Sequence, residues 1–190
     1  MKELKEAICT RGKAINQDIL LVDSFLNHQV DPMLMHGIGE AFADYFKDSG
    51  ADRVLTIESS GIAPAAFTAY KLGVPLVIMK KQTSKIMKGN LIQTAVRSFT
   101  KGTEYQLTVK RDFLPENSRV LFIDDFLASG EAAFGAIKLV GEAKAKLCGI
   151  GIVIEKSFQS GRKRLDELGI PILSLARVKS MGPDGIQFLE

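Results

Sequence analysis

Two adjacent acids, Asp124 and Asp125, stand between an apolar run and a stretch of small residues in the middle of the chain. Residues 120–124 are typical of a buried parallel strand, because they are continuously apolar up to the first carboxylate. We expect this strand to end at the acids. Open α/β sheets bind their ligands at the carboxyl ends of their strands, and carboxylates there can accept hydrogen bonds from vicinal hydroxyl groups. The acid pair therefore predicts a site for a sugar diol.

The small residues after the acids predict an anion site. Ala128, Ser129 and Gly130 lead into residues 131–140, which have apolar side chains at helical spacing. Free N–H groups at a helix start bind anions, and small side chains let a phosphate approach the backbone closely. A diol and a phosphate together describe a ribose 5-phosphate. The alternative is that the acids only cap the turn, as Asp often does, and the pattern alone leaves both interpretations open.

A second strand-to-helix turn repeats this arrangement earlier in the chain. The predicted strand at residues 53–57 runs into a turn rich in N–H and hydroxyl donors, and a further predicted strand at residues 74–79 stops on two lysines. Charges at the ligand-binding edge of a parallel sheet imply that more than one phosphate binds. The candidate residues of this second site are Ser59, Ser60, Gly61, Lys80 and Lys81.

Lys156 follows another predicted strand, at residues 146–154, and is preceded by Glu155. A strand neighbouring the acid-pair strand would direct the lysine toward the same crevice. We consider two interpretations of Lys156: it binds the ligand, or it is a solvated charge paired with Glu155.

The remaining segments give a coarse outline of the fold. A short helix to about Thr10 is predicted first, and residues 14–30 lack a clean period, so we expect short extended pieces there. Asp31 as N-cap and a proline at the first helical position predict the next helix. Its expected buried stripe is Leu34, Ile38, Phe42 and Tyr45.

Residues 82–110 change in character and predict a hairpin that projects from the core. A hairpin without a dense apolar pattern is a candidate flexible lid over the active site, because lids come from the least stable part of a fold. An ordinary surface hairpin is the alternative.

Composition limits the class of protein. The chain has 190 residues, 46% of them apolar, which suits a single domain, residues 1–190. The net charge is +3 and no basic run stands out, so we expect a small polyanionic substrate rather than a nucleic acid. No apolar stretch approaches the ~20 residues of a membrane span, and the charged N-terminal residues do not resemble a signal peptide. We expect a cytoplasmic protein with no membrane partner, in which Cys9 and Cys148 are reduced thiols.

The central segment resembles a known motif. Four apolar residues, two acids, two apolar residues and a small-residue loop, from residue 120 onward, are similar to the phosphoribosyl pyrophosphate motif of the type I phosphoribosyltransferases. The whole chain is similar to the bacterial xanthine phosphoribosyltransferases, most clearly at VDSFLNHQ (22–29), TIESSGIAP (56–64) and GIGIVIEKSF (149–158). The resemblance implies an α/β fold of the type I phosphoribosyltransferase kind. Its mainly parallel sheet would be flanked by helices, with an N-terminal hood at about residues 1–30 and a projecting flexible hairpin at about residues 82–110.

The resemblance also implies an activity, the transfer of a 5-phosphoribosyl group from phosphoribosyl pyrophosphate to N9 of xanthine. By it, Asp124 and Asp125 hold the ribose hydroxyls, and Asp125 is the nearest candidate for a general base. Xanthine would meet Leu20, Asn27 and Lys156. The 5-phosphate would bind Ala128, Ser129, Gly130, Glu131 and Ala132, and the pyrophosphate would bind Ser59, Ser60 and Gly61 with Lys80 or Lys81.

Further implications concern cofactor and assembly. Mg²⁺ would be bound with phosphoribosyl pyrophosphate rather than held by a metal site of the protein alone, and the protein would be a homodimer. Many family members have Gly-Gly-Thr where this chain has Gly130, Glu131 and Ala132. We therefore expect the Glu131 side chain to turn outward. The alternatives are transfer to another 6-oxopurine, hypoxanthine or guanine, or a regulator that senses phosphoribosyl pyrophosphate without catalysis.

Overall fold

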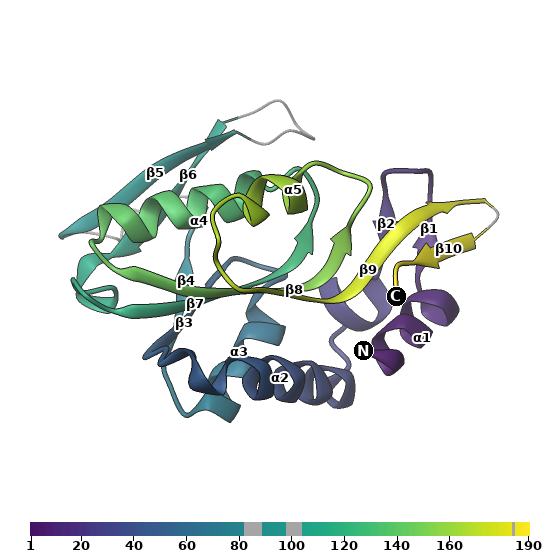
Figure 1. Ribbon diagram of the computed structural model, residues 1–190, viewed down its shortest axis with the longest axis horizontal. Helices are drawn as coiled ribbons and strands as arrows, with labels where there is room; N and C mark the ends of the chain where they lie inside the picture. The colour runs from purple at the N-terminus through teal and green to yellow at the C-terminus, as the bar shows by residue number, and fades with distance from the viewer. Residues whose placement is uncertain (82–88, 98–103, 184) are drawn as a thin grey trace.

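The computed structural model describes residues 1–81, 89–97, 104–183 and 185–190, and its centre is a six-stranded sheet (Figure 1). The strand order is β10-β9-β8-β7-β3-β4, and all neighbours are parallel except β10, which runs antiparallel to β9. The strands are β3 (Arg53–Ile57), β4 (Leu76–Met79), β7 (Arg119–Leu127), β8 (Lys146–Lys156), β9 (Ile172–Gly182) and β10 (Gly185–Phe188). The predicted mainly parallel sheet is confirmed.

Helices cover both faces of this sheet (Figure 1). On one face lie α2 (Pro32–Phe46) and α3 (Ile62–Leu72), and on the other lie α4 (Glu131–Glu142) and α5 (Gly161–Asp166). Successive side chains of a strand point to opposite faces. Leu121 and Ile123 of β7 accordingly join the core on the α2 side, and Val120 and Phe122 join the core on the α4 side. The continuously apolar sequence of β7 thus reflects burial on both faces.

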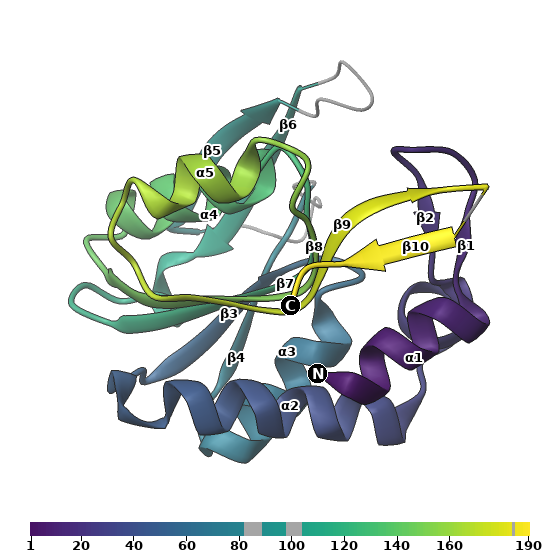
Figure 2. The same ribbon diagram turned by 45° about the vertical axis from the view of Figure 1, so that its right-hand side comes forward.

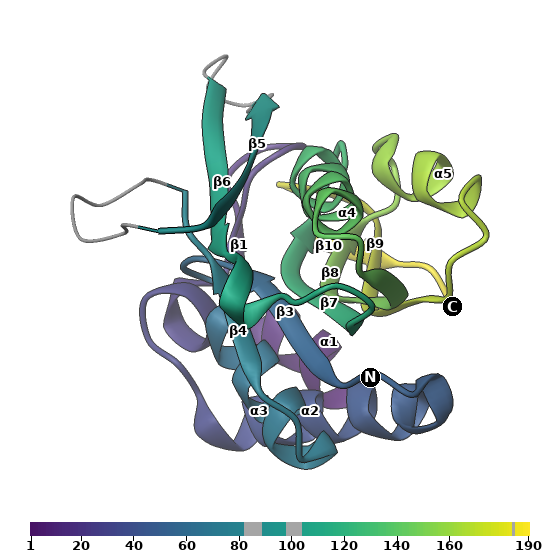
Figure 3. The ribbon, with the colours of Figure 1, turned by 90° about the vertical axis from the view of Figure 1, so that its left-hand side faces the viewer.

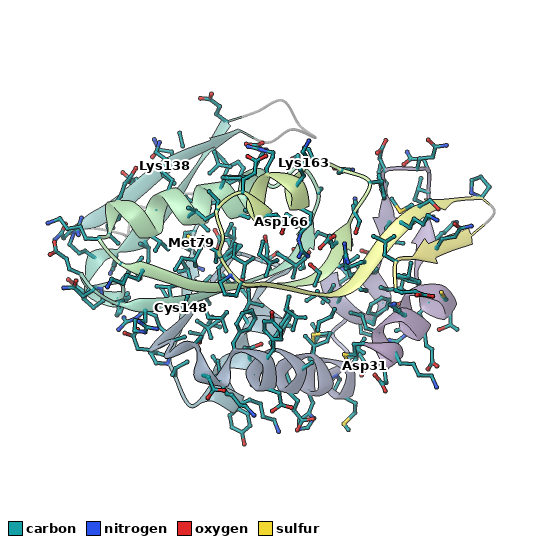
Figure 4. The ribbon with its side chains drawn as sticks, viewed as in Figure 1. Asp31, Met79, Lys138, Cys148, Lys163 and Asp166 are labelled. Carbon is teal, nitrogen blue, oxygen red and sulfur yellow. The ribbon has the colours of Figure 1, made fainter. Side chains whose placement is uncertain are left out.

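The start of α2 follows the prediction. Asp31 accepts hydrogen bonds from the backbone N–H groups of Met33 and Leu34, both at 3.2 Å, and Pro32 occupies the first turn. Figure 4 shows Asp31 at this end of the helix, close to the first helix of the chain. The prediction that Tyr45 is buried is wrong, because 54% of Tyr45 is exposed. Phe46, the next residue, is the one that packs inward at the end of the helix.

Strand β7 is longer than predicted. It continues past the acids, since Phe126 pairs with Ile154 and Leu127 pairs with Glu155 of β8. Asp124 and Asp125 therefore lie within the strand, not at its end. The acids interrupt the apolar pattern of the sequence, but the backbone pairing of β7 with β8 continues past them.

The N-terminal segment packs beside the last two strands (Figure 2). It contains α1 (Lys2–Arg11), β1 (Lys13–Ala14), β2 (Leu20–Leu21) and a single π-helical turn at Asp23–Asn27. The Lys5 ammonium donates to the carbonyl of Leu189 at 3.1 Å. The two short strands agree with the extended pieces expected in this segment, and the helical turn that buries Phe25 and Leu26 was not predicted. A five-residue turn is too short to show a helical period.

The hairpin of β5 (Leu91–Arg97) and β6 (Glu104–Lys110) rises beside α4 (Figure 3). Its inward side chains, Ile92, Val96, Leu107 and Val109, are buried in the same core as α4. Lys80 and Thr108 exchange two backbone hydrogen bonds of 2.9 Å, which tie the hairpin to the end of β4. Residues 82–88 and 98–103 of the predicted lid lie outside the described residues. None of the helices in the described ranges is long and apolar enough to cross a membrane.

Candidate active site

A cavity of about 190 Å³ opens at the carboxyl ends of β3 and β7. It is lined by Ile57, Glu58, Ser60, Gly61, Lys81, Asp124, Asp125, Phe126 and Ala132. A larger cavity of about 490 Å³ lies beside β4 and Phe113, but its wall does not include the acid pair or either small-residue loop. We place the site at the smaller cavity, because polar groups from several strand ends converge there.

The acid pair forms the floor of this cavity. Asp124 is 6% exposed, and one of its carboxylate oxygens accepts a hydrogen bond from the Asp125 backbone N–H at 3.1 Å. Burial raises the pKa of Asp124 well above its ordinary value, and the neighbouring Asp125 charge raises it further. Burial also raises the pKa of Asp125. Buried carboxyl groups with raised pKa values in a cleft are typical of functional sites.

The loop after β7 leads directly into α4, as predicted. Gly130 has a φ of 91°, a left-handed conformation that favours glycine, and it is the N-cap residue of α4. Gly161, at the start of α5, packs against the loop so closely that a Cβ would lie 2.3 Å from the carbonyl oxygen of Ala128. The Gly161 N–H donates to that carbonyl at 3.0 Å. The start of α5 thus fixes the shape of the predicted phosphate loop.

Glu131 does not line the site cavity, and its side chain is paired rather than free in solvent. Its carboxylate accepts a hydrogen bond of 2.6 Å from Arg164 of α5, and its side chain is 27% exposed. The pairing was not predicted because the partner, Arg164, is 33 residues away and gives no local signal in the sequence.

The turn after β3 faces the acid pair across the cavity. A Cβ at Gly61 would lie 2.3 Å from the Thr56 hydroxyl and 3.0 Å from an Asp124 carboxylate oxygen, so only glycine fits there. The Thr56 hydroxyl is buried and has no hydrogen-bond partner among the described residues. Ser60 and Gly61 line the cavity, whereas Ser59 is exposed and does not. The bond between Glu58 and Ser59 is a cis peptide.

The two lysines after β4 have different surroundings. The Lys80 ammonium pairs with Glu58 at 2.9 Å, and Lys80 lines the larger cavity beside β4. Lys81 lines the site cavity, and its ammonium lies 5.8 Å from the centre of the Tyr105 ring. Of the two alternatives for an anion-binding lysine, the structure therefore brings only Lys81 to the acid pair.

Lys156 lies beside the N-terminal segment. Its ammonium donates to the carbonyl of Asp18 at 2.6 Å and lies 5.2 Å from the centre of the Phe126 ring. Burial lowers the pKa of Lys156 below its ordinary value. Since Phe126 lines the site cavity, Lys156 is at the edge of the site.

The interpretation of Lys156 as a partner of Glu155 is wrong. The fully buried Glu155 pairs instead with Arg162 at 3.0 Å and with Arg177 at 3.2 Å. Glu155 and Lys156 are successive residues of β8, and successive side chains of a strand point to opposite faces, which separates the two side chains.

Leu20 and Asn27 come from the same N-terminal segment as Asp18. Leu20 is buried, Asn27 is exposed on the π-helical turn, and neither lines the cavity. The structure therefore brings Lys156 into contact with the hairpin of β1 and β2, and Asn27 takes no part in this contact.

Sequence reasoning missed three residues of the site. Phe126 follows the acids directly, so its position next to them was a usable signal. Tyr105 belongs to β6, and the centre of its ring lies 5.8 Å from the ammonium of Lys81, which lines the site cavity. The pKa of Tyr105 is raised first by burial and then by the charges of Asp124 and Glu131. Arg164 had no such signal.

The residues at the cavity also bear on a metal ion. Within the described ranges, no group of three or more His, Cys, Asp or Glu side chains lies together that could hold a metal alone. Mg²⁺ usually takes one or two carboxylates and completes its shell with water and substrate phosphates. Asp124 and Asp125, as adjacent carboxylates in the cavity wall, fit that kind of partial coordination.

The phosphoribosyl transferase domain family matches residues 29–171. This chain belongs to that family, and it is a phosphoribosyltransferase. Over its full length it is 52% identical to a xanthine phosphoribosyltransferase from Clostridium acetobutylicum and 54% identical to one from Agathobacter rectalis. Each of these alignments covers 100% of this chain, and they cover 100% and 99% of the two relatives, respectively.

Solved structures support the fold. Adenine phosphoribosyltransferase from Thermoanaerobacter pseudethanolicus superposes with a TM-score of 0.74 at 24% identity, over 92% of this chain and 97% of that chain. The enzyme from Giardia lamblia, complexed with 9-deazaadenine, gives a TM-score of 0.75 at 19% identity, over 90% of this chain and 96% of that chain. The expected type I phosphoribosyltransferase fold is confirmed.

Proposed function

We propose that this phosphoribosyltransferase acts in purine salvage and transfers the 5-phosphoribosyl group from phosphoribosyl pyrophosphate to N9 of xanthine. The products are xanthosine 5'-monophosphate and pyrophosphate. The observation that carries the proposal is the convergence of the buried acid pair, two strand-to-helix turns and Lys81 on one cavity. Identity above 50% to xanthine phosphoribosyltransferases over the full length supports the choice of base.

The sugar is proposed to lie along the carboxyl end of β7. Asp124 and Asp125 accept hydrogen bonds from the two ribose hydroxyls, which replaces the solvent that burial has removed from the carboxylates. The 5-phosphate binds the N–H groups of the loop from Ala128 to Ala132. No side chain among the described residues caps that start of α4, so its N–H groups are available to an anion.

The pyrophosphate is proposed to bind on the opposite wall. Ser60 and Gly61, which line the cavity, and the exposed Ser59 supply donors from the turn after β3, and Lys81 supplies a positive charge. Lys80 would act indirectly, by holding the Glu58 carboxylate at 2.9 Å beside this turn. Mg²⁺, arriving with phosphoribosyl pyrophosphate, would be held in part by Asp124 and Asp125 and would neutralise charge on the diphosphate.

Breaking the bond to the anomeric carbon develops positive charge on the sugar and negative charge on the departing pyrophosphate, as in other glycosyl transfers. Lys81 and the donors of the second turn stabilise the leaving group as its charge grows. The acid pair holds the ribose in place while the base attacks. Asp125 is the candidate, by its position in the motif, for the group that takes up the N9 proton.

The base is proposed to enter between the N-terminal hood, residues 1–30, and the end of β8. The Lys156 ammonium donates to the 6-oxo group, and the Phe126 ring, 5.2 Å from that ammonium, offers an apolar surface at the same place. Asn27 reads the 2-oxo edge and Leu20 covers the ring, which requires Asn27 to move toward Lys156. A donor at this position does not suit the amino group of adenine.

Transfer to hypoxanthine or guanine on the same scaffold is the second candidate, because Lys156 suits any 6-oxopurine. A regulator that senses phosphoribosyl pyrophosphate is disfavoured, since the net charge is only +3 and a DNA-binding protein would show a basic face.

The deciding experiment is a pyrophosphate-release assay with phosphoribosyl pyrophosphate, Mg²⁺ and each of four bases. We expect kcat/KM to be highest for xanthine, lower for guanine and hypoxanthine, and lowest for adenine. Equal kcat/KM values for xanthine, guanine and hypoxanthine would assign the enzyme to the broader class of 6-oxopurine phosphoribosyltransferases. No turnover together with tight binding of phosphoribosyl pyrophosphate would favour the regulator.

Three further properties belong to the proposal. The enzyme is a homodimer, and it is cytoplasmic, a compartment in which free thiols such as those of Cys9 and Cys148 stay reduced. It contacts neither nucleic acid nor membrane. The hairpin of β5 and β6 acts as a lid for the site, and its packed strands serve as the base of that lid.

A further inference from the structure

Arg164 joins α5 to the phosphate loop through a single nitrogen. Its Nη1 atom donates to the backbone carbonyl of Ser129 at 2.7 Å and to the Glu131 carboxylate at 2.6 Å. The guanidinium lies over the Phe134 ring, 4.3 Å from the ring centre. The stacking fixes the plane of the guanidinium, so both hydrogen bonds are held in one geometry.

The helix that carries Arg164 is itself anchored to the loop. The N–H of Gly161 donates to the carbonyl of Ala128, and Gly161 packs directly against Gly130. Residues three apart lie on the same face of a helix, so Arg164 points to the same side of α5 as Gly161. Backbone and side chain of α5 therefore hold the loop at two successive carbonyl groups, those of Ala128 and Ser129.

Glu131 creates a difficulty for phosphate binding in this loop. It is the first residue of α4, where a free carboxylate is attracted to the same N–H groups and helix dipole as a phosphate. An unpaired carboxylate would also repel a phosphate at short range. The next residue of the helix, Ala132, lines the site cavity, so the Glu131 charge lies directly beside the proposed phosphate position.

We propose that Arg164 is a positioning residue for the 5-phosphate: it holds the Glu131 carboxylate away from the N–H groups of α4, neutralises its charge and fixes the Ser129 carbonyl. This inference rests on the proposed placement of the 5-phosphate at residues 128–132. Arg164 acts through Glu131 and the loop backbone, and it needs no contact with the substrate.

The test is a double-mutant cycle in the full chain, read by calorimetric titration with phosphoribosyl pyrophosphate and Mg²⁺ and by steady-state kinetics. Arg164→Ala should weaken binding of phosphoribosyl pyrophosphate about 10-fold, with kcat and the KM for the base changed less than about 2-fold. Glu131→Gln should bind as tightly as the parent or up to about 3-fold tighter. In the Glu131→Gln background, Arg164→Ala should weaken binding of phosphoribosyl pyrophosphate by less than about 3-fold, because the charge that Arg164 neutralises is gone.

Salt dependence separates charge control from a merely structural role. The Debye length falls from about 10 Å at 0.1 M salt to about 3 Å at 1 M salt, so the Arg164→Ala defect relative to the parent should shrink as salt is added. Lys163→Ala is the matched control, because Lys163 is an exposed cation on the same helix that points away from the sheet (Figure 4). It should leave binding unchanged at every salt concentration.

Arg164→Met keeps the packing on Phe134 and replaces the alanine variant if that variant does not fold. An unchanged affinity in both variants, or an equal loss with and without Glu131→Gln, overturns the inference. If the parent protein neither binds nor consumes phosphoribosyl pyrophosphate, the proposed function fails instead, and the two failures are distinguishable.

Discussion

Lys156 is the side chain on which we propose that base selection depends. Replacing it with alanine removes the donor to the 6-oxo group, and a hydrogen bond to a charged group contributes about 1.5–3 kcal/mol. We expect Lys156→Ala to lower kcat/KM for xanthine by about 10- to 100-fold and to change the dissociation constant of phosphoribosyl pyrophosphate by less than about 2-fold. Initial rates and calorimetric titration measure these quantities. Equal losses for both substrates would remove Lys156 from the base pocket.

Asp124 should limit the stability of the free enzyme. Its pKa is raised by burial in the folded state above the ordinary 3.8, so the folded protein binds a proton more tightly than the unfolded chain. Stability associated with this group is fully present below the unfolded pKa and is lost as the pH rises through the folded pKa. Asp124→Asn removes the buried charge, and we expect a higher Tm than the parent at pH 7 and no such gain near pH 3.5.

The same variant should lower kcat/KM by about 10-fold or more, because the amide is a poorer acceptor for a ribose hydroxyl. Thermal melts across pH, with Asp44→Asn on the exposed side of α2 as control, check the stability effect. A Tm gain that does not depend on pH would mean that the carboxylate charge is not the cause.

For single residues, the sequence indicates the chemistry of a side chain better than it indicates which distant residue that side chain contacts. The acid pair and the small-residue loop are recognisable because residue type and order carry the information. The choice between Lys80 and Lys81, and the pairing of Glu131 with Arg164, depend on contacts across 22 and 33 residues of sequence, respectively. A local sequence pattern cannot predict such contacts.

The turn between β3 and α3 should tolerate no side chain at Gly61. A Cβ there would lie 2.3 Å from the Thr56 hydroxyl and 3.0 Å from Asp124, so the turn must shift away from β7. Overpacking of this kind costs about 1–3 kcal/mol. For a chain of this size that corresponds to a fall in Tm of roughly 2–12 °C. We expect Gly61→Ala to show this fall and to weaken phosphoribosyl pyrophosphate binding by about 10-fold.

Gly141→Ala is the control for this glycine prediction. Gly141 lies in α4 with nothing within 4 Å of its expected Cβ, so alanine should raise helix stability by about 0.5–1 kcal/mol. Differential scanning calorimetry and titration of both variants provide the comparison. If Gly61→Ala bound phosphoribosyl pyrophosphate normally, the turn after β3 would not hold the leaving group.

The elements themselves were predicted wherever a period extends over enough residues. The strand β3, the helix α2 with its Asp31 cap and the hairpin of β5 and β6 lie where the pattern placed them. The end of β7 was missed because the acids break the apolar run while the backbone pairing to β8 continues. The sequence of the hood did not predict its π-helical turn, since this segment is ordered by packing against distant strands.

For the whole molecule, we predict a dimer in solution. The chain has a mass of 20.8 kDa, and large apolar side chains such as Tyr70 and Phe113 are 79% and 59% exposed. Exposed apolar surface favours association with a second copy. Light scattering coupled to size-exclusion chromatography should give twice the chain mass from micromolar concentrations upward. A particle with the mass of one chain that turns over at full rate would contradict the prediction.

The contact between Lys5 and Leu189 joins the two ends of the chain across 184 residues. A ribosome adds residues from the N-terminus onward, and contacts between distant residues form late because a long loop must close first. Helix α1 is therefore among the first segments to emerge and among the last to find its partners. Strands β3, β4, β7 and β8 and the two turns of the proposed phosphate sites can assemble before β9 and β10 are available to the hood. We therefore expect a nascent or truncated chain to acquire the proposed sugar-phosphate site before the proposed base pocket.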